Sequence, residues 1–531
     1  FVQHTVGEYR FNSIADFEAG KVDRIYYGSG AGTNNPDDAA ASFAYATNTL
    51  YLQDEFYATD SLTVLLGLRY DWYSSDDKPT LNSNFLGRYG YSNQSTMDGV
   101  DLLQPRLGFN WSASDALDVR GGIGLYSGGN PNVWISNSYS NDGITNAQFN
   151  IRGVDLTTEP LSGSGRPLVD IPQRLRDSVT NSNGDSQVNA IDPNFEVPSE
   201  WKYALGASYR LGAGYDLTGD LIYTQKKDSA IVRDIGLRDS GKDAPDGRPI
   251  YETINGRSGD LILTNVSGDD GDSLALSLGV SKQFDNGFDV NFGYAYVRST
   301  DVNPMTSSVA GSNYGNIAVS DPLNPGVETS NYEIPHRLTM NIAYETEFFA
   351  GYSTRVNVFA SANEGLPYNY TFSRSDSAFG DSSFFSNGRQ LLYIPAVNDP
   401  NVVYGPNFDV AAFNQFVQSE NLEKYRGKIA PRNGQNADWW AKLDLRIEQE
   451  IPGFFGDDKA SAFFVIKNLG NLLNDEWGVL KQGSFVGEAV VGMSLDANSK
   501  YVYESFSAPS MQTIQNGPSL WEARFGVKYN F

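Results

Sequence analysis

The chain has 531 residues, with 39 basic and 64 acidic side chains, a net charge of −25 and no cysteine. This length alone predicts three or four ordinary domains, but Gly (53), Tyr (31) and Phe (30) are abundant, a composition typical of strands and turns. The acidic surplus excludes a general nucleic-acid binder. The lack of cysteine excludes disulfide scaffolds, CxxC zinc sites and thiol catalysis. No run approaches the roughly 20 apolar residues of a membrane-spanning helix, which excludes a helical membrane protein.

Many segments alternate apolar and polar residues with a period of two. Segment 62–72 places mainly Leu, Val, Tyr and Trp on one face and Thr, Gly, Arg and Asp on the other, and 288–296, 439–448 and 521–531 alternate in the same way. This period predicts strands with one apolar and one polar face. Further segments of this kind begin near Leu107, Leu117, Tyr203, Tyr215, Leu274, Leu338, Val356 and Ala460.

The connections between these segments are alternately short and long. Short turns are predicted at 58–61, 112–116, 212–214, 285–287 and 349–352, and long polar stretches at 74–102, 128–200, 227–271, 300–334 and 364–437. An outer-membrane barrel has this arrangement, with short periplasmic turns and long outer loops, whereas a soluble sandwich does not require it. The predicted fold class is therefore all-β, a transmembrane antiparallel β-barrel. Asp285-Asn286-Gly287 is a good tight-turn sequence, because Asn-Gly supplies positive φ angles.

Of the two strand faces, one is apolar enough to contact a lipid bilayer and the other is not. Because Arg or Lys facing lipid at mid-membrane costs roughly 2 to 4 kcal/mol, the apolar face is expected to meet lipid and the charged face to line the lumen. Aromatic residues at segment ends predict an interfacial girdle, although a large water-soluble β-protein would also place Trp at strand ends. The girdle candidates are Tyr70, Trp72, Trp111, Tyr126 and Trp439.

The strand count predicts a closed barrel. Fifteen segments are expected from about Thr49 to Phe531, and the first enters from the outer side, so that Phe1–Phe11 would be its partner and bring the total to about sixteen. An even count closes a barrel with both termini periplasmic. Sixteen strands fit a porin and about twenty-two a plugged transporter, and the count leaves both open. Residues 1–531 are predicted to form one barrel domain, with large extracellular loops at 128–200 and 364–437.

Four motifs carry a resemblance to a known family. They are GGNPNVW at 128–134 with SNDG at 140–143, DVNPMTSS at 301–308, SNYEIPHR at 330–337, and KNLGNLLN at 467–474 before a terminal Phe531. The chain resembles TonB-dependent outer-membrane receptors of the Oar-like kind along nearly its whole length. The first two motifs are fairly specific to that subgroup, and the last two are shared widely among receptors.

The resemblance implies a 22-stranded barrel preceded by a plug domain and a TonB-interacting segment, often with a small β-sandwich extension. The plug and about six strands are expected to be missing from this chain, which begins at Phe1 without a signal-peptide pattern and is expected to be processed, trimmed or incomplete. The implied partners are the lipid bilayer, lipopolysaccharide, the TonB complex and the outer-membrane assembly machinery. The assembly signal would be the terminal strand residues Phe525, Val527, Tyr529 and Phe531.

A candidate calcium loop lies at 181–192. Oxygen-bearing residues stand at positions 1, 3, 5, 9 and 12 of this twelve-residue segment, with a backbone carbonyl at position 7, as in EF-hand-like loops. The segment resembles dockerin-type calcium loops, although Asn181 replaces the usual Asp and Ser186 the usual Gly. A polar Asx-rich turn is the alternative. The predicted ligands of Ca²⁺ are Asn181, Asn183, Asp185, Gln187, Asn189 and Asp192.

Ligand recognition is predicted in the same long loop. Aromatic and amide side chains can stack on sugars or contact a peptide. The candidate residues are Asn130, Asn132, Trp134, Tyr139, Asn141 and Asp142.

Other features are weaker. Asp269–Asp272 predicts either a rim cation site or, more simply, a solvated acidic loop. His336 and His4 are the two histidines of the sequence, so no histidine cluster is available for a metal site. A structural or lumen-facing role is therefore favoured for His336. There is no P-loop, GxSxG or HExxH motif, and the sequence predicts no enzyme.

Three functions are compatible with these features. The first is active transport, in which outer loops capture a scarce ligand and a plug moves when pulled from the periplasm. The second is a passive porin whose acidic loops favour cations. The third is a surface protein that uses its loops for adhesion or protein cargo, as the resemblance allows. The acidic residues of loops and lumen are further expected to hold Mg²⁺ or Ca²⁺ beside lipopolysaccharide, so that these ions stabilise the protein.

Overall fold

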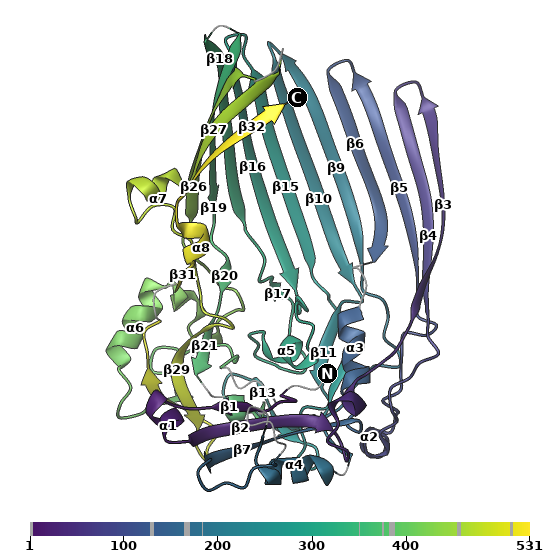
Figure 1. Ribbon diagram of the computed structural model, residues 1–531, viewed down its shortest axis with the longest axis vertical. Coiled ribbons are helices and arrows are strands. Elements are labelled where there is room, and N and C mark those ends of the chain that lie inside the picture. The colour runs from purple at the N-terminus through teal and green to yellow at the C-terminus, as the bar shows by residue number, and fades with distance from the viewer. Residues whose placement is uncertain are drawn as a thin grey trace.

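The computed structural model describes residues 4–530 apart from 128–131, 164–169, 183, 350, 374–375, 382–387, 454–457 and 510–512. Its dominant element is one curved antiparallel sheet (Figure 1) in the order β3-β4-β5-β6-β9-β10-β15-β16-β18-β19-β26-β27-β32, with a short β17 paired to the end of β16. The all-β barrel-type architecture predicted from the alternating segments is confirmed. These strands are β3 (Ala46–Thr59), β4 (Leu62–Ser74), β5 (Asp101–Ser114), β6 (Leu117–Ser127), β9 (Ser199–Gly212), β10 (Tyr215–Lys227), β15 (Asp272–Gln283), β16 (Phe288–Asp301), β17 (Glu328–Thr329), β18 (His336–Phe349), β19 (Tyr352–Asn363), β26 (Trp440–Pro452), β27 (Lys459–Lys467) and β32 (Glu522–Asn530).

Short and long connections alternate around this sheet as predicted, and the short turns gather at one end of it (Figure 1). In the turn between β15 and β16, the N–H of Phe284 donates to the carbonyl of Phe288 at 2.8 Å. Gly287 has φ +86° and Asn286 is not among the positive-φ residues, so the left-handed position falls on the glycine alone. The tight turn is confirmed, with one positive φ angle.

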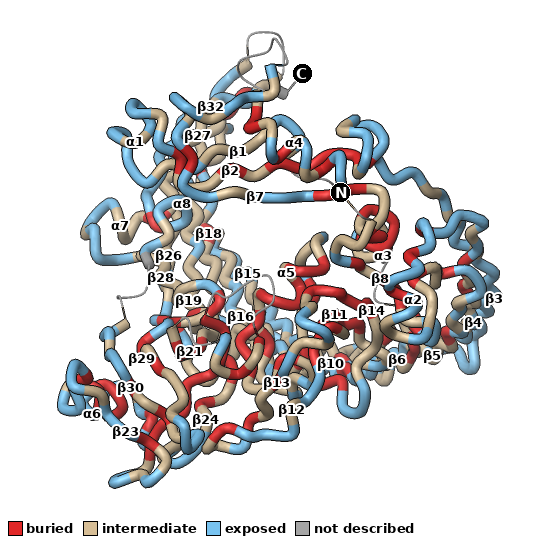
Figure 2. The backbone as a smooth tube through the Cα atoms, turned by 90° about the horizontal axis from the view of Figure 1, so that it is seen from below, coloured by how far each residue is buried: buried red, intermediate tan, exposed pale blue. Residues whose placement is uncertain are grey.

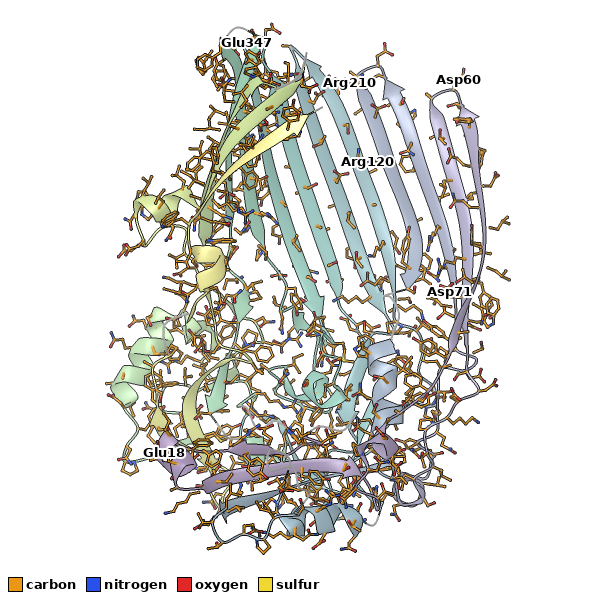
Figure 3. All side chains as sticks on the ribbon, viewed as in Figure 1. Glu18, Asp60, Asp71, Arg120, Arg210 and Glu347 are labelled. Atoms are coloured by element: carbon orange, nitrogen blue, oxygen red, sulfur yellow. The ribbon has the colours of Figure 1, made fainter. Side chains whose placement is uncertain are left out.

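The two faces of the sheet differ in chemistry as expected. The apolar face is well exposed, as at Leu205 and Phe292, while the opposite face carries ion pairs such as Arg210 with Asp118 at 3.3 Å. Arg120 of β6 pairs with Asp220 of β10 across β9. Figure 3 shows Arg120 and Arg210 on these strands. Ion pairing along one face supports its assignment to the lumen.

A glycine makes room for the ion pair between β6 and β10. Gly206 of β9 lies between Arg120 and Asp220, and a Cβ there would overlap the Asp220 carboxylate and crowd the Arg120 guanidinium. The gap left by the missing side chain therefore lets an ion pair form across an intervening strand.

Four of the five girdle candidates lie on the apolar face. Tyr70 and Trp72 stack at 5.5 Å between ring centroids on β4, and Trp111 and Trp439 are exposed near opposite ends of the sheet. The prediction for Tyr126 is wrong, because this residue shares the lumen face with Arg120 and the guanidinium of Arg106 stacks on its ring at 4.6 Å. Alternation within β6 places Tyr126 away from lipid.

The strand count and the partner of the first strand are corrected. Among the described residues the main path has thirteen strands and not sixteen, and its edge strands β3 and β32 are not paired with each other. The described part of Phe1–Phe11 does not join the sheet: β1 (Glu8–Arg10) pairs with β2 (Lys21–Gly30). Ser13 caps α1 (Ile14–Glu18), and the helix reverses the chain so that these two strands meet.

The positions of the chain ends follow from the odd count. The last described strand, β32, ends beside the short turns, whereas β1 and β2 lie at the opposite, loop end (Figure 1). An odd number of antiparallel strands puts its two ends on opposite sides. The expectation of two periplasmic ends is therefore wrong for the described residues.

The segments at the loop end form what we call the loop assembly: residues 4–45 and the long connections 75–100, 128–198, 228–271, 302–335, 364–439 and 468–521. The last connection, between β27 and β32, was not predicted. The described residues of the loop assembly form seven small sheets. Their strands are β1, β2 and β7 (Asn146–Asp155); β8 (Asn189–Ile191), β11 (Ala230–Asp234) and β14 (Leu261–Asn265); β12 (Leu237–Asp243) and β13 (Pro249–Thr253); β20 (Pro367–Tyr368) and β25 (Gln435–Asn436); β21 (Tyr370–Ser373), β29 (Glu488–Leu495), β30 (Tyr501–Phe506) and β23 (Val402–Tyr404); β22 (Tyr393–Ile394) and β24 (Lys428–Ile429); β28 (Lys481–Gln482) and β31 (Thr513–Ile514).

All described helices are short and belong to the loop assembly. None is long and apolar enough to cross a membrane. Besides α1 they are α2 (Ser83–Tyr89), α3 (Asn132–Ser140), α4 (Gln173–Thr180), α5 (Ala310–Gly315), α6 (Val410–Ser419), α7 (Leu469–Leu473) and α8 (Asn516–Ser519), with 3₁₀ turns η1 (Pro36–Ala39), η2 (Asp376–Phe379) and η3 (Leu422–Tyr425).

The predicted long loops are packed structures with apolar cores. The largest core joins aromatic residues of 364–439 and 468–521, among them Phe372, Phe413 and Tyr503. A second core holds Ile135, Ile191 and neighbours from other connections. Viewed from the loop end (Figure 2), β1, β2, β7 and α4 lie along one side of the molecule, while β29, β30 and α6 lie along another. This packing fixes the positions of loop residues that are distant in sequence.

Candidate ligand-binding site in the loop assembly

A polar cavity of about 1200 Å³ lies in the loop assembly. Its walls come from β7, from His4 before β1 and Arg10 at its end, from Tyr26 in the middle of β2, from α3 and the following turn, and from segments 182–189 and 255–261. Eight of its lining residues are amides, and three serines and three arginines are among the rest. The amides are Asn137, Asn141, Asn146, Gln148, Asn150, Gln187, Asn189 and Asn255.

Several of these amides are available to a ligand. Asn137 and Asn146 use their side chains to hold nearby backbone carbonyls, so they belong to the wall. Within the described part of the chain, Gln148 and Asn150 make no side-chain hydrogen bond, and both are exposed on β7. Phe149 between them shares the opposite strand face with Tyr27, so its ring points away from the two amides. A free amide both donates and accepts. The cavity thus offers groups that donate and accept hydrogen bonds.

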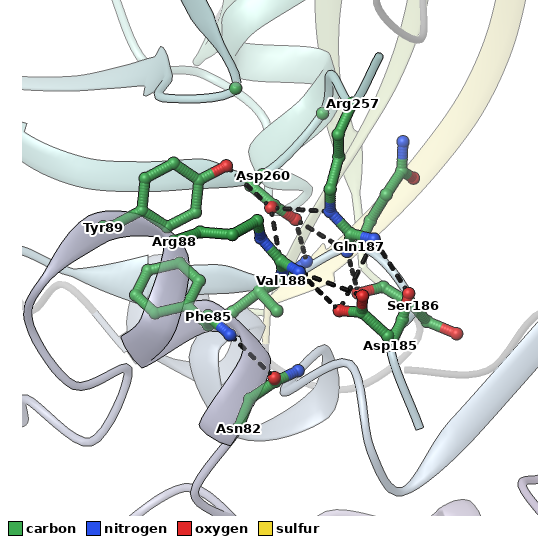
Figure 4. A network of polar contacts seen from close by, with 12 residues as sticks. Asn82, Phe85, Arg88, Tyr89, Asp185, Ser186, Gln187, Val188, Arg257 and Asp260 are labelled. Carbon is green, nitrogen blue, oxygen red and sulfur yellow. Dashed lines mark hydrogen bonds and ion pairs between the residues drawn. The ribbon is translucent and has the colours of Figure 1, made fainter. Parts of the chain in front are cut away.

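A buried ion network supports the opposite wall (Figure 4). Asp260 is fully buried and accepts hydrogen bonds from Arg257 Nε at 2.8 Å, from the Tyr89 hydroxyl at 2.8 Å and from the backbone N–H of Val188 at 2.9 Å. Arg88 of α2 lies 3.4 Å from the same carboxylate and donates to both oxygens of Asp185 at 2.8 and 2.9 Å. One carboxylate therefore ties α2, segment 185–188 and the 255–261 turn together.

Two members of this network have raised pKa values. Burial of Arg257 acts to lower its pKa, but the hydrogen bond and the charge of Asp260 outweigh it and raise the pKa above the usual value. Burial, together with Asp260, raises the pKa of Tyr89 well above its usual range. The guanidinium of Arg257 therefore stays charged and the phenol of Tyr89 stays protonated at any physiological pH.

A second buried carboxyl holds the 255–261 turn from behind. Asp234 at the end of β11 accepts the N–H of Gly236 at 2.9 Å and the N–H of Gly259 at 2.8 Å. Burial raises the pKa of Asp234 to about 6, and the two N–H donors only partly oppose this. The charges of Asp260 and Asp381 raise the pKa further. This carboxyl changes its protonation state in a mildly acidic environment.

The raised pKa predicts how stability changes with pH. Because the ordinary pKa is 3.8, the folded state binds this proton more tightly, and the stabilising contribution, present below that value, is lost as the pH rises through about 6. Relative to Asp234→Asn, which does not titrate, the wild type should lose about 2 to 3 kcal/mol of unfolding free energy between about pH 4 and pH 7.5. Denaturant unfolding of the loop assembly at several pH values, read by loop proteolysis, measures the difference. A difference between the two proteins that does not depend on pH would contradict the assignment.

The structure separates the ligand residues predicted from the sequence. Asn141 lines the cavity, while Asn130 and the side chain of Asn132 lie outside the described residues. Tyr139 is buried, stacks on Phe43 at 4.1 Å between ring centroids and donates its hydroxyl to the carbonyl of Asp77 at 2.9 Å. It is therefore a packing residue and does not present its ring to a ligand.

The two remaining candidates of that loop also have structural contacts. Trp134 packs against the second core. Asp142 is buried and accepts the backbone N–H groups of Ile144 and Thr145, both at 2.8 Å, which fixes the turn after α3. Neither residue is among those that line the cavity.

The predicted calcium ligands make contacts of other kinds. Asn183 lies outside the described residues, Asn181 is exposed, and the Asp185 carboxylate is held by Arg88 and Arg257. The remaining three diverge: Gln187 donates to the carbonyl of Ser258, the Asn189 N–H to that of Asn141, and Asp192 accepts from Thr264. No cluster of three or more His, Cys, Asp or Glu suited to a metal occurs in the described ranges. Guanidinium groups occupy the place of a cation at Asp185, so calcium binding stays a prediction without support from these contacts.

The weaker features have plain structural roles. Asp272 pairs with Arg298 at 2.6 Å, Asp269 caps the turn at Gly271, and Asp270 is buried, so the acidic run is only partly solvated. His336 accepts or donates a hydrogen bond with the Tyr294 hydroxyl at 2.9 Å and stacks near Trp439, on the apolar face and not in the lumen.

Three residues of the predicted assembly signal lie on the terminal strand β32. Phe525 and Val527 are strongly exposed on the apolar face of β32, and the Tyr529 hydroxyl donates to Asp458 at 2.8 Å; Phe531 lies outside the described residues. Recognition by the assembly machinery stays a prediction.

Sequence reasoning missed the residues that matter most to the cavity. Gln148 and Asn150 alternate with Phe149 along β7, but the run Asn-Ala-Gln-Phe-Asn is one of many polar runs in the chain. Asp260 has no distinctive neighbours in sequence. Its role depends on contacts with Arg88 and Val188, 172 and 72 positions away, which no local motif signals.

The family of the chain follows from a match along most of its length. A model of the outer membrane beta barrel domain family matches residues 2–460. The chain belongs to this family. The outer-membrane barrel is therefore an integral protein of the outer membrane, and its apolar strand face meets lipid. No curated protein matches the chain at a significant level.

Solved structures similar to this barrel include outer-membrane transporters. They are YddB from Escherichia coli (11% identity, 92% of this chain and 45% of that chain, TM-score 0.43), the FrpB iron transporter from Neisseria meningitidis, F5-1 variant (10%, 99% and 55%, 0.43), and the ferric enterobactin receptor PfeA, a mutant from Pseudomonas aeruginosa (10%, 92% and 45%, 0.41). The barrel spans about half the length of each of these chains. At these values the likeness leads to no conclusion about ligand or mechanism.

Proposed function

We propose that this barrel is part of a TonB-dependent receptor that captures a polar ligand at its extracellular loops and passes it through the membrane with energy coupled from the inner membrane. The observation that supports it best is the amide-lined cavity of about 1200 Å³ at the loop end of the sheet. The receptor motifs at 128–143 and 301–308 add support from the sequence. The proposal includes a plug domain and a TonB-interacting segment as further parts of the receptor.

The chemistry of the cavity favours an oligosaccharide as the ligand. Sugar hydroxyls both donate and accept hydrogen bonds, which matches the free amides of Gln148 and Asn150. Both amides lie on the same face of β7, on which Asn150 pairs with Tyr26, a further residue of the cavity lining. The arginines Arg88 and Arg257 are neutralised by Asp185 and Asp260, so the wall does not select strongly for anions.

A double substitution tests the cavity. Gln148→Ala with Asn150→Ala removes two ligand hydrogen bonds, each worth about 1 to 1.5 kcal/mol, and should weaken oligosaccharide binding roughly tenfold to a hundredfold without changing stability. Calorimetric titration of the full-length protein with a panel of neutral oligosaccharides and tripeptides measures it. Gln415→Ala with Gln418→Ala, two exposed amides of α6, is the matched control and should leave binding unchanged.

The outcomes separate the ligand class from the receptor function. Binding of tripeptides alone, weakened by the same double substitution, would replace the sugar by a peptide and keep the receptor. Uptake that does not depend on the proton-motive force, together with swelling of liposomes by small sugars, would overturn active transport in favour of a passive porin.

A further inference from the structure

A second cavity lies on the outer side of the barrel wall. It has a volume of about 530 Å³ and is lined by the apolar faces of β16, β18, β19 and β26 on one side and by α7 and its following turn on the other. The residues that decide its chemistry are Leu338, Ala360, Ala441, Trp439, Leu473 and Trp477. In Figure 1, α7 projects beyond β26 on the outside of the curved sheet. The cavity is an apolar groove that opens beside the strands.

The groove exists because small residues lie under a fixed arm of the chain. Ala360, Ala362 and Ala441 form its floor where larger side chains occupy the same face elsewhere. The arm 468–480 is held against the sheet: the carbonyl of Gly478 accepts from Trp440 Nε1 at 2.9 Å and from Asn468 Nδ2 at 3.0 Å. Asn468 is fully buried, and its N–H donates to Asp444 at 2.8 Å. The groove is therefore preformed.

The groove is continuous with the surface that meets lipid. Its floor lies on the same face as Phe292 and Leu443, whose strands span the membrane, and its open end carries Trp439 and Trp477, both more than half exposed. Exposed Trp residues lie at the headgroup level of a membrane. Since Trp439 directly precedes β26 at the loop end of the sheet, this is the outer leaflet.

We propose that the groove binds one acyl chain of an outer-leaflet lipid and retains that lipid on the barrel. The walls are almost wholly apolar, and each CH₂ group buried there adds about 0.8 kcal/mol relative to water. A bilayer already supplies an apolar surrounding, so the gain over ordinary boundary lipid comes from close packing between two rigid walls. The bound chain lies along β26 between Trp439 and Trp477.

The experiment fills the groove without altering the polar loops. Ala441→Phe places a ring on the floor, and Ala207→Phe on β9 puts the same ring on the same face far from the groove. The full-length protein is reconstituted in phosphatidylethanolamine–phosphatidylglycerol vesicles with a varied fraction of lipid brominated on its acyl chains. The fluorescence of Trp477, taken as the difference between the wild type and Trp477→Phe, reports bromine in the groove.

Retention predicts quenching of Trp477 that saturates at roughly a tenfold lower brominated fraction than quenching of the other tryptophans. The Ala441→Phe protein should lose this saturating quenching of Trp477, and the Ala207→Phe protein should keep it. Quenching of Trp477 in simple proportion to the brominated fraction overturns the proposal. So does a saturating step that survives in Ala441→Phe. If Ala441→Phe fails to assemble, the wild-type curve of Trp477 quenching against brominated fraction decides between saturation and simple proportion.

Discussion

Asp260→Ala should destabilise the loop assembly by about 3 to 5 kcal/mol, because the largely buried guanidinium groups of Arg88 and Arg257 then share the single carboxylate of Asp185 and one positive charge is left uncompensated. Asp260 is fully buried and bonded to three segments of the chain. The backbone N–H of Val188 also loses its acceptor. Loss of hydrogen-exchange protection in 185–191 and 255–263, with the sheet strands unchanged, is the measurement that checks this.

An exposed ion pair of the same kind provides the control. Arg238 and Glu252 pair at 2.7 Å in a strand hairpin of the loop assembly, with about half of each side chain exposed. Glu252→Ala should cost no more than about 1 kcal/mol, since water replaces the lost contact. Equal protection after both substitutions would show that the Asp260 network does not hold the cavity wall. A selective loss of oligosaccharide binding in Asp260→Ala would connect the network to the proposed ligand.

Leu278→Arg should impair the barrel itself by about 2 to 4 kcal/mol. Leu278 lies near the middle of β15, half-exposed on the apolar face and paired with Tyr294 and Gly219. A guanidinium at this depth faces lipid and has no partner. Folding into lipid vesicles, followed by the mobility shift between folded and heat-denatured protein, gives the stability difference.

The neighbouring residue is a matched control. Ser277 is one position away on the opposite face, with Asp220 of β10 beside it in register. Ser277→Arg should be tolerated, because the lumen is wet and an acidic partner is close. The reverse result, with Ser277→Arg the more damaging substitution, would mean that the two faces are exchanged.

The regular part of the fold was accessible from the sequence. A period of two in 62–72 and 288–296 depends only on side-chain chemistry along one strand, and the short turns are set by local residues such as Gly287. The girdle prediction failed at Tyr126. Aromatic residues near strand ends predict a girdle, but tyrosine is amphipathic, and the ring of Tyr126 stacks with Arg106 on the lumen face.

The irregular part was not accessible, because it depends on contacts between distant segments. Residues 1–11 were predicted to pair with the first strand of the large sheet. Instead, β1 pairs with β2 after the α1 turn, and β2 in turn pairs with β7, which lies more than a hundred positions further on. The calcium-like spacing at 181–192 is real as a sequence pattern, but Arg88 and Arg257, from two other connections, meet its central carboxylate. Charge partners that come from elsewhere in the chain cannot be seen from spacing.

The β1-β2-β7 sheet also has a consequence for the order of folding. Ile25 of β2 pairs with Ile151 of β7, and between these two residues the chain forms β3, β4, β5 and β6. Closing so long a loop is costly in entropy until the intervening strands bring its ends together. The wall that carries Gln148 and Asn150 is therefore completed only after two hairpins have crossed the membrane, and the cavity forms late in assembly.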